Sequence, residues 1–274
     1  MKKLFTLLLL VLTITSCEDV IELDLNNTAP RLVIDAELEL NEDGTTLATV
    51  LLTRSNAFYQ EEIITVDDAI VTVTDENGTV FNFNLVALGV YENTSLNIQP
   101  GASYTLTIID GSDIYTATQR FVNTVPYTRV EQNNISGFGD LVEITGFFND
   151  PAGEENYYLF ELIDHTTPSN SEIDIIDDEF SDGNEALTVF FIDEEDLPVG
   201  SDLTLVIRGI DRRAFTFYDT LIQQTDDGGG GTFNAQPATV RGNIINTTNP
   251  EKFPFGYFRV SEVFKIDYTV VANP

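Results

Sequence analysis

The sequence predicts a mostly β protein, with an N-terminal β-sandwich followed by a second β-rich domain that contains one amphipathic helix. Two observations support this prediction. The 274-residue chain has 19 Phe and 10 Tyr but no Trp and one Met, and its many Val, Ile and Thr suit the pleated, half-buried surface of a sheet. Apolar and polar residues alternate in short runs that end at Asn, Asp, Gly or Pro, which is the pattern of strands joined by turns.

The start of the chain has the features of a secretion signal that ends at the sole cysteine. A positively charged start precedes the apolar run 4–14, which is shorter than the roughly 20 residues needed to span a bilayer. Residues 14–17, Ile-Thr-Ser-Cys, resemble the bacterial lipobox, in which the cysteine is acylated after cleavage. The alternative is an ordinary signal peptide that contains a cysteine by chance. The resulting prediction is a signal peptide over 1–16, a lipid on Cys17 and a tether over 17–29.

Two-residue alternation marks the strands of the first predicted domain, residues 30–124. Its opening strand alternates aliphatic with mostly acidic residues, so one face is expected in the core and the other in a polar environment. Asn77 and Gly78 supply the positive φ that a tight hairpin needs. The predicted strands are 32–40, 46–53, 69–74 and 79–85, with Phe81, Phe83 and Leu85 on the core face of the last.

A Pro-Gly turn followed by a tyrosine indicates the kind of sandwich. Pro100, Gly101 and Tyr104 lead into an alternating strand and resemble the tyrosine corner of immunoglobulin- and fibronectin-like sandwiches, where the hydroxyl bonds back to the backbone. A further strand at 115–122 brings the count to seven or eight, the usual number for this fold. We expect a junction with few contacts at 122–127 and a first domain that folds alone.

The second predicted domain, residues 125–274, combines strands with one helix. Phe215 and Tyr218 recur at helical spacing after Asp211, a good N-cap, and predict an amphipathic helix over 212–224. A glycine-rich loop follows the helix. The predicted strands are 141–148, 157–163, 187–192, 203–210, 240–245, 256–260 and 264–270.

Several short motifs, in this order and spacing, resemble those of a known family. They are the lipobox, Ala69-x-Val71-x-Val73-x-Asp75 with Asn77 and Gly78, Gly89-x-Tyr91, Pro100-Gly101-x-x-Tyr104-x-Leu106, Phe217 with Tyr218 and Leu221, 241–244 (Arg-Gly-Asn-Ile) and 255–258 (Phe-Gly-Tyr-Phe). The whole mature chain resembles a lipoprotein family of the Bacteroidota catalogued as domain of unknown function 4249. The resemblance implies an outer-membrane lipoprotein, often encoded beside TonB-dependent receptors, with no established activity and no catalytic residue to carry over.

Two acidic residues follow the predicted lipidation site directly. In that phylum, such residues resemble the signal that sends lipoproteins to the outer face of the membrane, and Glu18 and Asp19 fit the pattern. The resemblance therefore implies a protein that is anchored to the outer membrane through Cys17 and faces the cell exterior. The alternative is a periplasm-facing protein whose tether carries two solvated carboxylates.

The charge of the chain excludes nucleic acid as a partner. The formal net charge is −32, from 45 Asp and Glu against 13 Lys and Arg, and such a surface repels a phosphate backbone. Solubility explains this charge, and attraction of cations or of a basic partner is the alternative. With Cys17 acylated, no thiol remains for a disulfide or for redox chemistry.

Signatures of catalysis and metal binding are sparse. His165 is the sole histidine, and no G-x-S-x-G, H-E-x-x-H or glycine-rich phosphate loop occurs, so we expect no enzyme, no catalytic residue and no cofactor. Two groups of acidic residues could offer oxygen ligands for calcium, but neither group has the spacing of an EF-hand. A solvated loop is the simpler interpretation of each, and no metal site is predicted. The acidic groups are Asp174, Asp177, Asp178, Glu179 and Asp182, and residues 193–196.

Three other motifs have both a functional and a structural interpretation. Aromatic residues at 58–59 and 253–258 would stack on sugars if exposed, but their alternation favours the core. Gly242 and Gly256 interrupt apolar strands, and a close crossing of two backbones is favoured over a ligand site. Residues 219–221, Asp-Thr-Leu, resemble a Bacteroidota O-glycosylation site but lie in the predicted helix.

Three functional hypotheses follow. The leading one is a non-enzymatic surface lipoprotein that partners a TonB-dependent receptor barrel and captures its substrate or shapes its extracellular entrance. The second is a structural or adhesive surface protein. The third is an envelope hydrolase that uses a carboxylate pair. The sequence does not identify a ligand.

We expect Cys17→Ala to release a protein that takes up no fatty acid, because each buried CH₂ of an acyl chain contributes about 0.8 kcal/mol to membrane attachment. Palmitate labelling followed by membrane fractionation measures both effects. Ser16→Ala keeps a small residue before the cysteine and is the matched control, which should label like the wild type. Palmitate on the Cys17→Ala protein would refute the lipobox interpretation.

Overall fold

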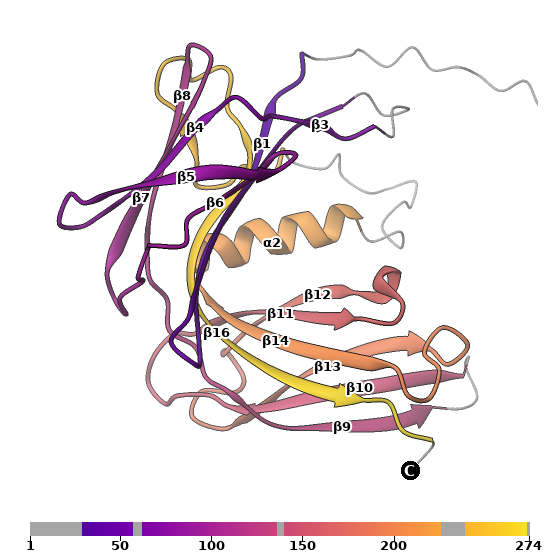
Figure 1. Ribbon diagram of the computed structural model, residues 1–274. Coiled ribbons are helices and arrows are strands. Elements are labelled where there is room, and N and C mark those ends of the chain that lie inside the picture. The colour runs from indigo at the N-terminus through magenta and orange to yellow at the C-terminus, as the bar shows by residue number, and fades with distance from the viewer. Residues whose placement is uncertain (1–28, 57–61, 136–139, 226–238, 273–274) are drawn as a thin grey trace, which may run out of the picture.

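The structure, a computed structural model, describes residues 29–56, 62–135, 140–225 and 239–272. Its strands form one sheet of 13 strands and one sheet of three, and one α-helix occurs among the described residues. Figure 1 shows the two β-rich halves with this helix between them. The mostly β prediction, with a sandwich followed by a β-rich part that contains one helix, is confirmed.

The elements follow the predicted alternation closely. The first half contains β1 (Leu32–Asn41), β2 (Thr46–Arg54), β3 (Ile64–Thr65), β4 (Ile70–Asp75), β5 (Val80–Ala87), β6 (Val90–Glu92), β7 (Ser103–Asp110) and β8 (Asp113–Arg120). The second half contains β9 (Tyr127–Ile135), β10 (Leu141–Asn149), β11 (Tyr157–Asp164), the 3₁₀ turn η1 (Pro168–Asn170), β12 (Glu172–Asp177), β13 (Glu185–Asp193), β14 (Asp202–Ile210), α2 (Arg212–Thr225), β15 (Ile245–Asn246) and β16 (Phe255–Thr269).

The first half is a sandwich because its sheet folds back on itself at β5, so that the strands on the two sides of β5 form two facing layers. That strand pairs with β6 on one side and with β4 on the other, so β1, β2, β4, β7 and β8 enclose one core. The register of β5 against β6 shifts after Leu85. As a result Phe83 is buried and Phe81 packs partly against the core, but Leu85, which was predicted on the core face, is exposed.

The tyrosine corner has the predicted geometry. Tyr104 is buried, its hydroxyl accepts a hydrogen bond from the Gln99 backbone N–H at 2.8 Å, and Gly101 turns the chain with a φ of +75°. Tyr91 makes a similar cross-link, since its hydroxyl accepts from the Ala69 N–H and donates to the Val66 carbonyl, each at 3.0 Å. Two buried tyrosines therefore tie loops of the sandwich to its strands.

Strand β16 belongs to both halves of the molecule. Its first part runs parallel to β1, from Phe255 opposite Val33 to Val263 opposite Asn41, and its last part is antiparallel to β14. The prediction of two strands, 256–260 and 264–270, was wrong, because β16 continues through the polar Ser261 between them. Ser261 is buried, and its hydroxyl donates a hydrogen bond to the Gly209 carbonyl at 2.7 Å, so a polar side chain does not interrupt the strand. One long curved strand therefore carries a single sheet from one half into the other (Figure 1).

The connection between the halves is closely packed, contrary to the predicted junction with few contacts. The Val122 N–H donates to the Val260 carbonyl at 3.0 Å, and the Val122 carbonyl accepts from Glu262 at 2.9 Å. A Cβ on Gly209 would lie 2.1 Å from the Asn123 carbonyl oxygen. The first core also contains Phe258 and Val260 from β16. The division at residue 124 and the independent folding of 30–124 therefore stay predictions, with β16 as a shared strand.

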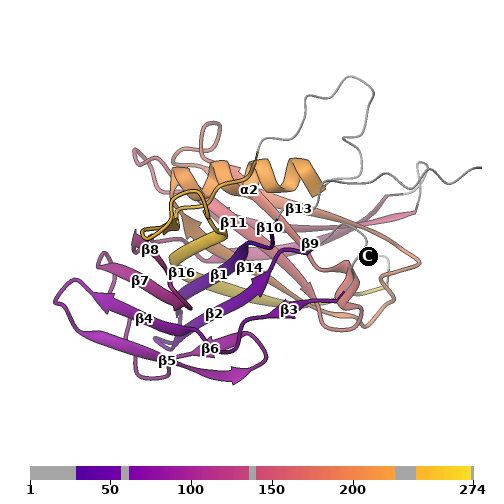
Figure 2. The ribbon, with the colours of Figure 1, turned by 90° about the horizontal axis from the view of Figure 1, so that it is seen from above.

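The second half consists of two sheet layers, with α2 on the outer face of one of them. Strands β9, β10 and β13 pack against β11, β14 and the end of β16 around an aromatic core. On the other face of the large sheet, Phe217 and Tyr218 of α2 contact the Tyr257 ring. Figure 1 shows α2 inside the curve of β16, and Figure 2 shows from above that the strands of the sandwich lie to one side of it.

The predicted helix 212–224 is confirmed by α2, and several strand predictions need correction. Asp211 caps α2, because its Oδ1 accepts the Ala214 N–H at 2.7 Å. Residues 240–245 form a strand only at β15. Strands β9 and β12 were not predicted because polar or acidic residues occupy much of their length. The predicted glycine-rich loop lies outside the described residues after Thr225.

We expect Tyr104→Phe to lower the free energy of unfolding by about 1 to 2 kcal/mol, because the ring still packs while the Gln99 N–H loses its acceptor. Urea unfolding of the full chain measures the change. Tyr268→Phe removes the hydroxyl of a more exposed tyrosine and should cost less. Equal losses in the two variants would contradict a special role for the corner.

Candidate functional site

A groove of about 550 Å³ runs beside α2 on the sheet face that joins the two halves. Its lining combines apolar side chains with charged and polar ones. The apolar lining residues are Val33, Ile34, Leu159, Ile163, Ile173, Phe217 and Leu221, and the polar ones are Asp35, Glu37, Glu161, Arg208, Tyr218, Tyr257 and Arg259. The groove therefore combines contact area for an apolar group with charges held at defined positions.

Arg208, which lines this groove, binds a carboxylate of the first half that is buried beside it. Arg208 of β14 donates through Nε to Glu39 Oε1 of β1 at 2.5 Å, and its Nη1 lies 2.8 Å from Glu161 Oε2. Between β14 and β1 lies β16, where the residue opposite Glu39 is Ser261. Glu39 is 2% exposed and Arg208 8%. This ion pair bridges three strands in a nearly dry environment.

A second arginine repeats the arrangement one step along the sheet. Arg259 of β16 pairs with Glu37 and donates to the Tyr218 hydroxyl of α2, and its Nη1 lies 3.6 Å from Asp35 Oδ1. Its Nε is buried and has no hydrogen-bond partner among the described residues. Below, Arg208, Arg259, Glu37 and Glu39 are called the charge ladder.

The surroundings of the charge ladder shift the pKa values of Glu37 and Glu39 in opposite directions. Burial raises the pKa of Glu37, and Arg259 offsets only part of that rise. Burial acts in the same sense on Glu39, but Arg208 and Arg259 together outweigh it, so the pKa of Glu39 is lowered. Glu39 therefore contributes stability above the ordinary Glu pKa of about 4.3, which is lost as the pH falls through its lowered pKa. Glu37 contributes stability at low pH that is lost as the pH rises through its raised pKa.

A second hollow, of about 600 Å³, lies on another side of α2. We call it the arginine hollow. Three guanidinium groups and three hydroxyl groups dominate its lining. The lining residues are Arg212, Arg213, Thr216, Phe217, Thr220, Thr239, Val240 and Arg241.

The segment that carries Arg241 is held by the close backbone crossing expected at Gly242 and Gly256. A Cβ on Gly242 would lie 1.7 Å from the Gly256 carbonyl oxygen, and a Cβ on Gly256 would lie 1.8 Å from the Ile34 carbonyl oxygen. Buried Asn243 donates to the Phe258 carbonyl at 2.7 Å and accepts from its N–H at 2.9 Å. The structural interpretation of these glycines is confirmed.

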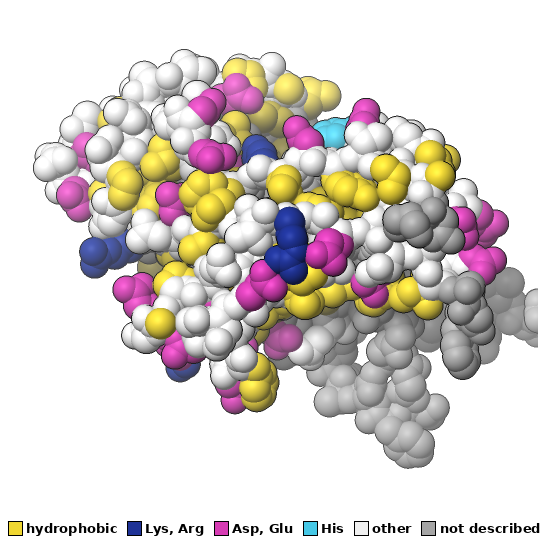
Figure 3. Space-filling view, turned by 90° about the horizontal axis from the view of Figure 1, so that it is seen from below, with side chains coloured by type: hydrophobic (Ala, Val, Ile, Leu, Met, Phe, Trp, Pro, Cys, Tyr) yellow, Lys and Arg dark blue, Asp and Glu magenta, His cyan; other side chains and the backbone are white. Residues whose placement is uncertain are grey.

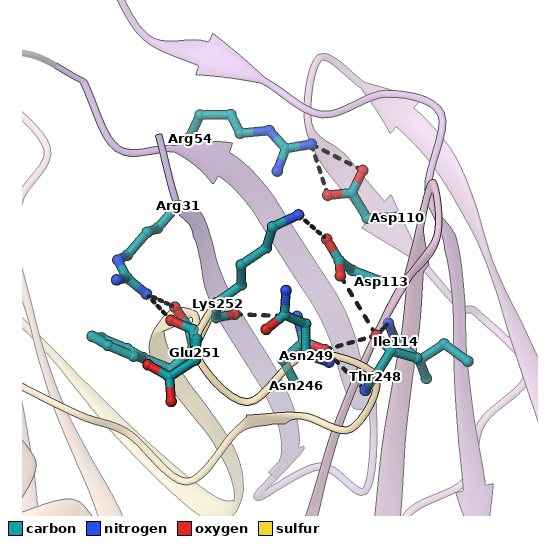
Figure 4. Close-up of polar contacts among 11 residues, drawn as sticks. Arg31, Arg54, Asp110, Asp113, Ile114, Asn246, Thr248, Asn249, Glu251 and Lys252 are labelled. Atoms are coloured by element: carbon teal, nitrogen blue, oxygen red, sulfur yellow. Dashed lines mark hydrogen bonds and ion pairs between the residues drawn. The ribbon is translucent and has the colours of Figure 1, made fainter. Parts of the chain in front are cut away.

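A polar cluster at the start of β1 ties the segment before β16 to the sandwich (Figure 4). Arg54 pairs with Asp110 at 2.7 Å, and Lys252 Nζ lies 3.1 Å from Asp113 Oδ2. The hydrogen bond from Lys252 lowers the pKa of Asp113. Arg31 donates to two backbone carbonyls of the same segment, each at 3.1 Å. The two ion pairs, Arg54 with Asp110 and Lys252 with Asp113, neutralise their own charges. The cluster therefore indicates a structural role.

The acidic groups of the sequence separate in space. Oxygens of Asp178 and Asp182 lie within 4.8 Å of each other and of an oxygen of Asp150. Sequence analysis missed Asp150 because it follows β10, far from the other two in the sequence. Asp150 accepts from the Tyr158 hydroxyl at 2.5 Å, and burial raises the pKa of Asp150. Asp182 accepts from the Gly153 N–H at 2.6 Å. The carboxylates therefore accept hydrogen bonds from neighbouring protein groups, which is the arrangement of a structural loop.

The remaining acidic candidates lie elsewhere. Asp174 and Asp177 belong to β12, and Glu179 follows that strand. Asp193, Glu194 and Glu195 line a separate hollow with Asp140, and Asp196 lies at the turn beyond it.

His165 follows β11, as expected for a strand-end residue, and its hydrogen bonds do not form a nucleophile and base pair. Its Nε2 lies 2.9 Å from Thr204 Oγ1, whose proton is donated to Asp267 Oδ1 at 2.7 Å. The histidine therefore donates to the threonine instead of accepting its proton. The predicted lipidation and export residues, Cys17, Glu18 and Asp19, lie outside the described residues, as do residues 58–59.

We expect Arg208→Met to lower the free energy of unfolding by about 3 to 5 kcal/mol, because Glu39 is left buried and unpaired. The double variant with Glu39→Met should recover much of that loss, since two apolar side chains then fill the space. Urea unfolding at neutral pH is the measurement.

Arg129→Met is the matched control for this prediction. Arg129 also bridges strands, but its partners Glu131 and Glu185 are exposed, so the loss should stay below about 1 kcal/mol. Equal losses at Arg208 and Arg129, or no recovery in the double variant, would contradict the importance of the charge ladder.

Among the described residues, no helix has the length and apolar character needed to cross a membrane. No curated protein matches the sequence. Solved structures similar to this chain include a two-domain fibronectin type III segment of chicken tenascin, at 14% identity and a TM-score of 0.21, with 66% of this chain and 91% of that chain covered. The chicken CNTN1 FN1–FN3 domains match at 11% identity and a TM-score of 0.25, over 68% of this chain and 62% of that one.

A DUF4785 family protein from Legionella pneumophila matches at 15% identity and a TM-score of 0.22, over 66% of this chain and 52% of that one. A family model covers nearly the entire sequence, including the charge ladder and the arginine hollow: it matches residues 18–267. The chain belongs to the family described as Domain of unknown function (DUF4249).

Proposed function

We propose that this protein is a non-enzymatic lipoprotein, anchored to the outer membrane through Cys17 and facing the cell exterior, that captures a ligand for a TonB-dependent receptor or shapes the entrance of that receptor. The observation that carries the proposal is the groove beside α2, which lies where the two halves share a sheet. Concave sites with apolar walls and a few positioned polar groups are typical of ligand binding.

The chemistry of the groove favours binding over catalysis. Its arginines and carboxylates are bound to one another, so they hold each other at fixed positions in the groove. Burial raises the pKa of Tyr218, which keeps its hydroxyl protonated at neutral pH. The buried Arg259 Nε is a donor without a partner among the described residues. A ligand with an apolar part and a polar group that meets the Tyr218 hydroxyl or the charged side chains fits this lining.

An adhesive or structural surface protein is the second candidate. The outer face of the sheet β9-β10-β13 carries exposed hydrophobic side chains, among them Ile135, Leu187 and Phe191. Figure 3, which views the molecule from below, shows hydrophobic side chains gathered on this side around a basic side chain and its acidic neighbours. Exposed apolar patches of this kind often mark protein contacts. The envelope hydrolase stays the third candidate.

The leading proposal predicts that a receptor barrel co-purifies with the tagged protein from detergent-solubilised outer membranes, and that Leu221→Arg weakens this association at least tenfold by placing a charge in the groove. Quantitative mass spectrometry of the purified complex is the measurement. Leu88→Arg is the matched control, because Leu88 is 73% exposed and lies outside the groove.

The alternatives give different results in the same experiment. Purification of the protein without any barrel, together with binding to matrix or neighbouring cells, would favour the adhesive role. Equal loss of the barrel in both variants would remove the groove from the proposal.

A further inference from the structure

We propose that the arginine hollow is a binding site for an oxyanion, such as the phosphate or carboxylate group of a small ligand. This site is separate from the groove, and the proposal does not depend on the membrane anchor. The hollow measures about 600 Å³, which is more than a free phosphate needs and falls within the range of small-molecule sites. A sugar phosphate or an acidic sugar has the corresponding size and charge.

The charge of the hollow is opposite to that of the protein. Asp and Glu outnumber Lys and Arg by 45 to 13, yet three of these few cations line one hollow. Arg212 is bound to Glu155 and Tyr157. Arg213 and Arg241 have no carboxylate within ion-pair distance among the described residues. Among the described residues these two guanidinium groups are not paired with a carboxylate, and in so acidic a chain they form a local reversal of charge that favours an anion.

Each of these two guanidinium groups has a partner that holds it in position but carries no negative charge to neutralise it. Arg213 donates to the Gly242 carbonyl at 2.7 Å. The Arg241 Cζ lies 3.9 Å from the centre of the Phe253 ring, and the Arg31 Cζ lies 3.8 Å from the same centre. The crossing at Gly242 holds the backbone next to Arg241 against β16. The site is therefore preorganised, which reduces the entropy lost on binding.

The other lining groups suit the same class of ligand. Arginine presents a planar fork of donors that matches the oxygens of phosphate and carboxylate. Thr216, Thr220 and Thr239 add hydroxyl groups to the lining, although Thr216 and Thr220 also donate to helix carbonyls at 3.0 and 2.8 Å. Phe217 and Val240 supply apolar contact for the rest of a ligand.

Isothermal titration of the purified Cys17→Ala protein with inorganic phosphate tests the proposal. We expect saturable binding that weakens as sodium chloride is added, and at least a tenfold loss of affinity in Arg241→Gln and in Arg213→Gln, because a charge-assisted hydrogen bond is removed. Arg241→Lys keeps the charge but loses the fork, so it should bind more weakly than the wild type and more tightly than Arg241→Gln.

Arg120→Gln is the matched control. Arg120 is an exposed arginine of β8 outside the hollow, also without a carboxylate partner among the described residues, and its replacement changes the net charge by the same amount. We expect its affinity for phosphate to stay within twofold of the wild type. Thermal melting of each variant separates loss of binding from loss of folding.

Flotation with phosphatidylcholine vesicles, with and without phosphatidylglycerol, distinguishes the source of the oxyanion. Flotation that needs phosphatidylglycerol together with Arg213 and Arg241 assigns the site to a lipid headgroup, and phosphate binding without such flotation assigns it to a soluble ligand. The proposal is overturned if phosphate and anionic vesicles both fail to bind the wild type, or if Arg120→Gln loses as much affinity as the variants in the hollow.

Discussion

The ion pair between Arg208 and Glu39 is the constraint on which the arrangement of the two halves depends. It joins β14 to β1 over the strand between them, with both side chains nearly excluded from water. A pair in such a place adds little stability compared with apolar residues, but it strongly disfavours any packing that separates its members. The charge ladder therefore specifies the register in which β1, β16 and β14 meet, and with it the position of α2 and of both hollows.

Close contacts between backbones complete this specification. Gly242, Gly256 and Gly209 each lie where a Cβ would overlap a carbonyl oxygen of another segment. Gly242 and Gly256 allow their two segments and β1 to cross at one place, and Gly209 lets the connection at Asn123 approach β14 at another. Gly256 and Arg241, which lie at this crossing, line the groove and the arginine hollow respectively, so the lining residues come from segments that are far apart in the sequence but firmly held in space.

Sequence patterns predicted what is local in this fold. The alternation in β1, the cap at Asp211 and the turn before Tyr104 each depend on residues within one element, and each was found as predicted. Pairing over long distances was not accessible in the same way. The sequence does not show that the acidic side of β1 faces Arg208 and Arg259, although a single arginine within the apolar run of β14 is a signal for a buried partner. The functional predictions at Cys17, Glu18 and Asp19 rest on a part of the chain outside the described residues.

The parallel pairing of β1 with β16 also has a consequence for folding. Arg259 follows Glu37 by 222 residues, so the pairing of their strands closes a very long loop, and such non-local contacts form slowly. Until β16 is in place, one edge of β1 is unpaired, which is the kind of surface that recruits strands from other chains. Asp35, Glu37 and Glu39 lie along this strand. Before they meet their arginines, the carboxylates that later specify the register place negative charge on the open edge, and such charge disfavours pairing with another chain.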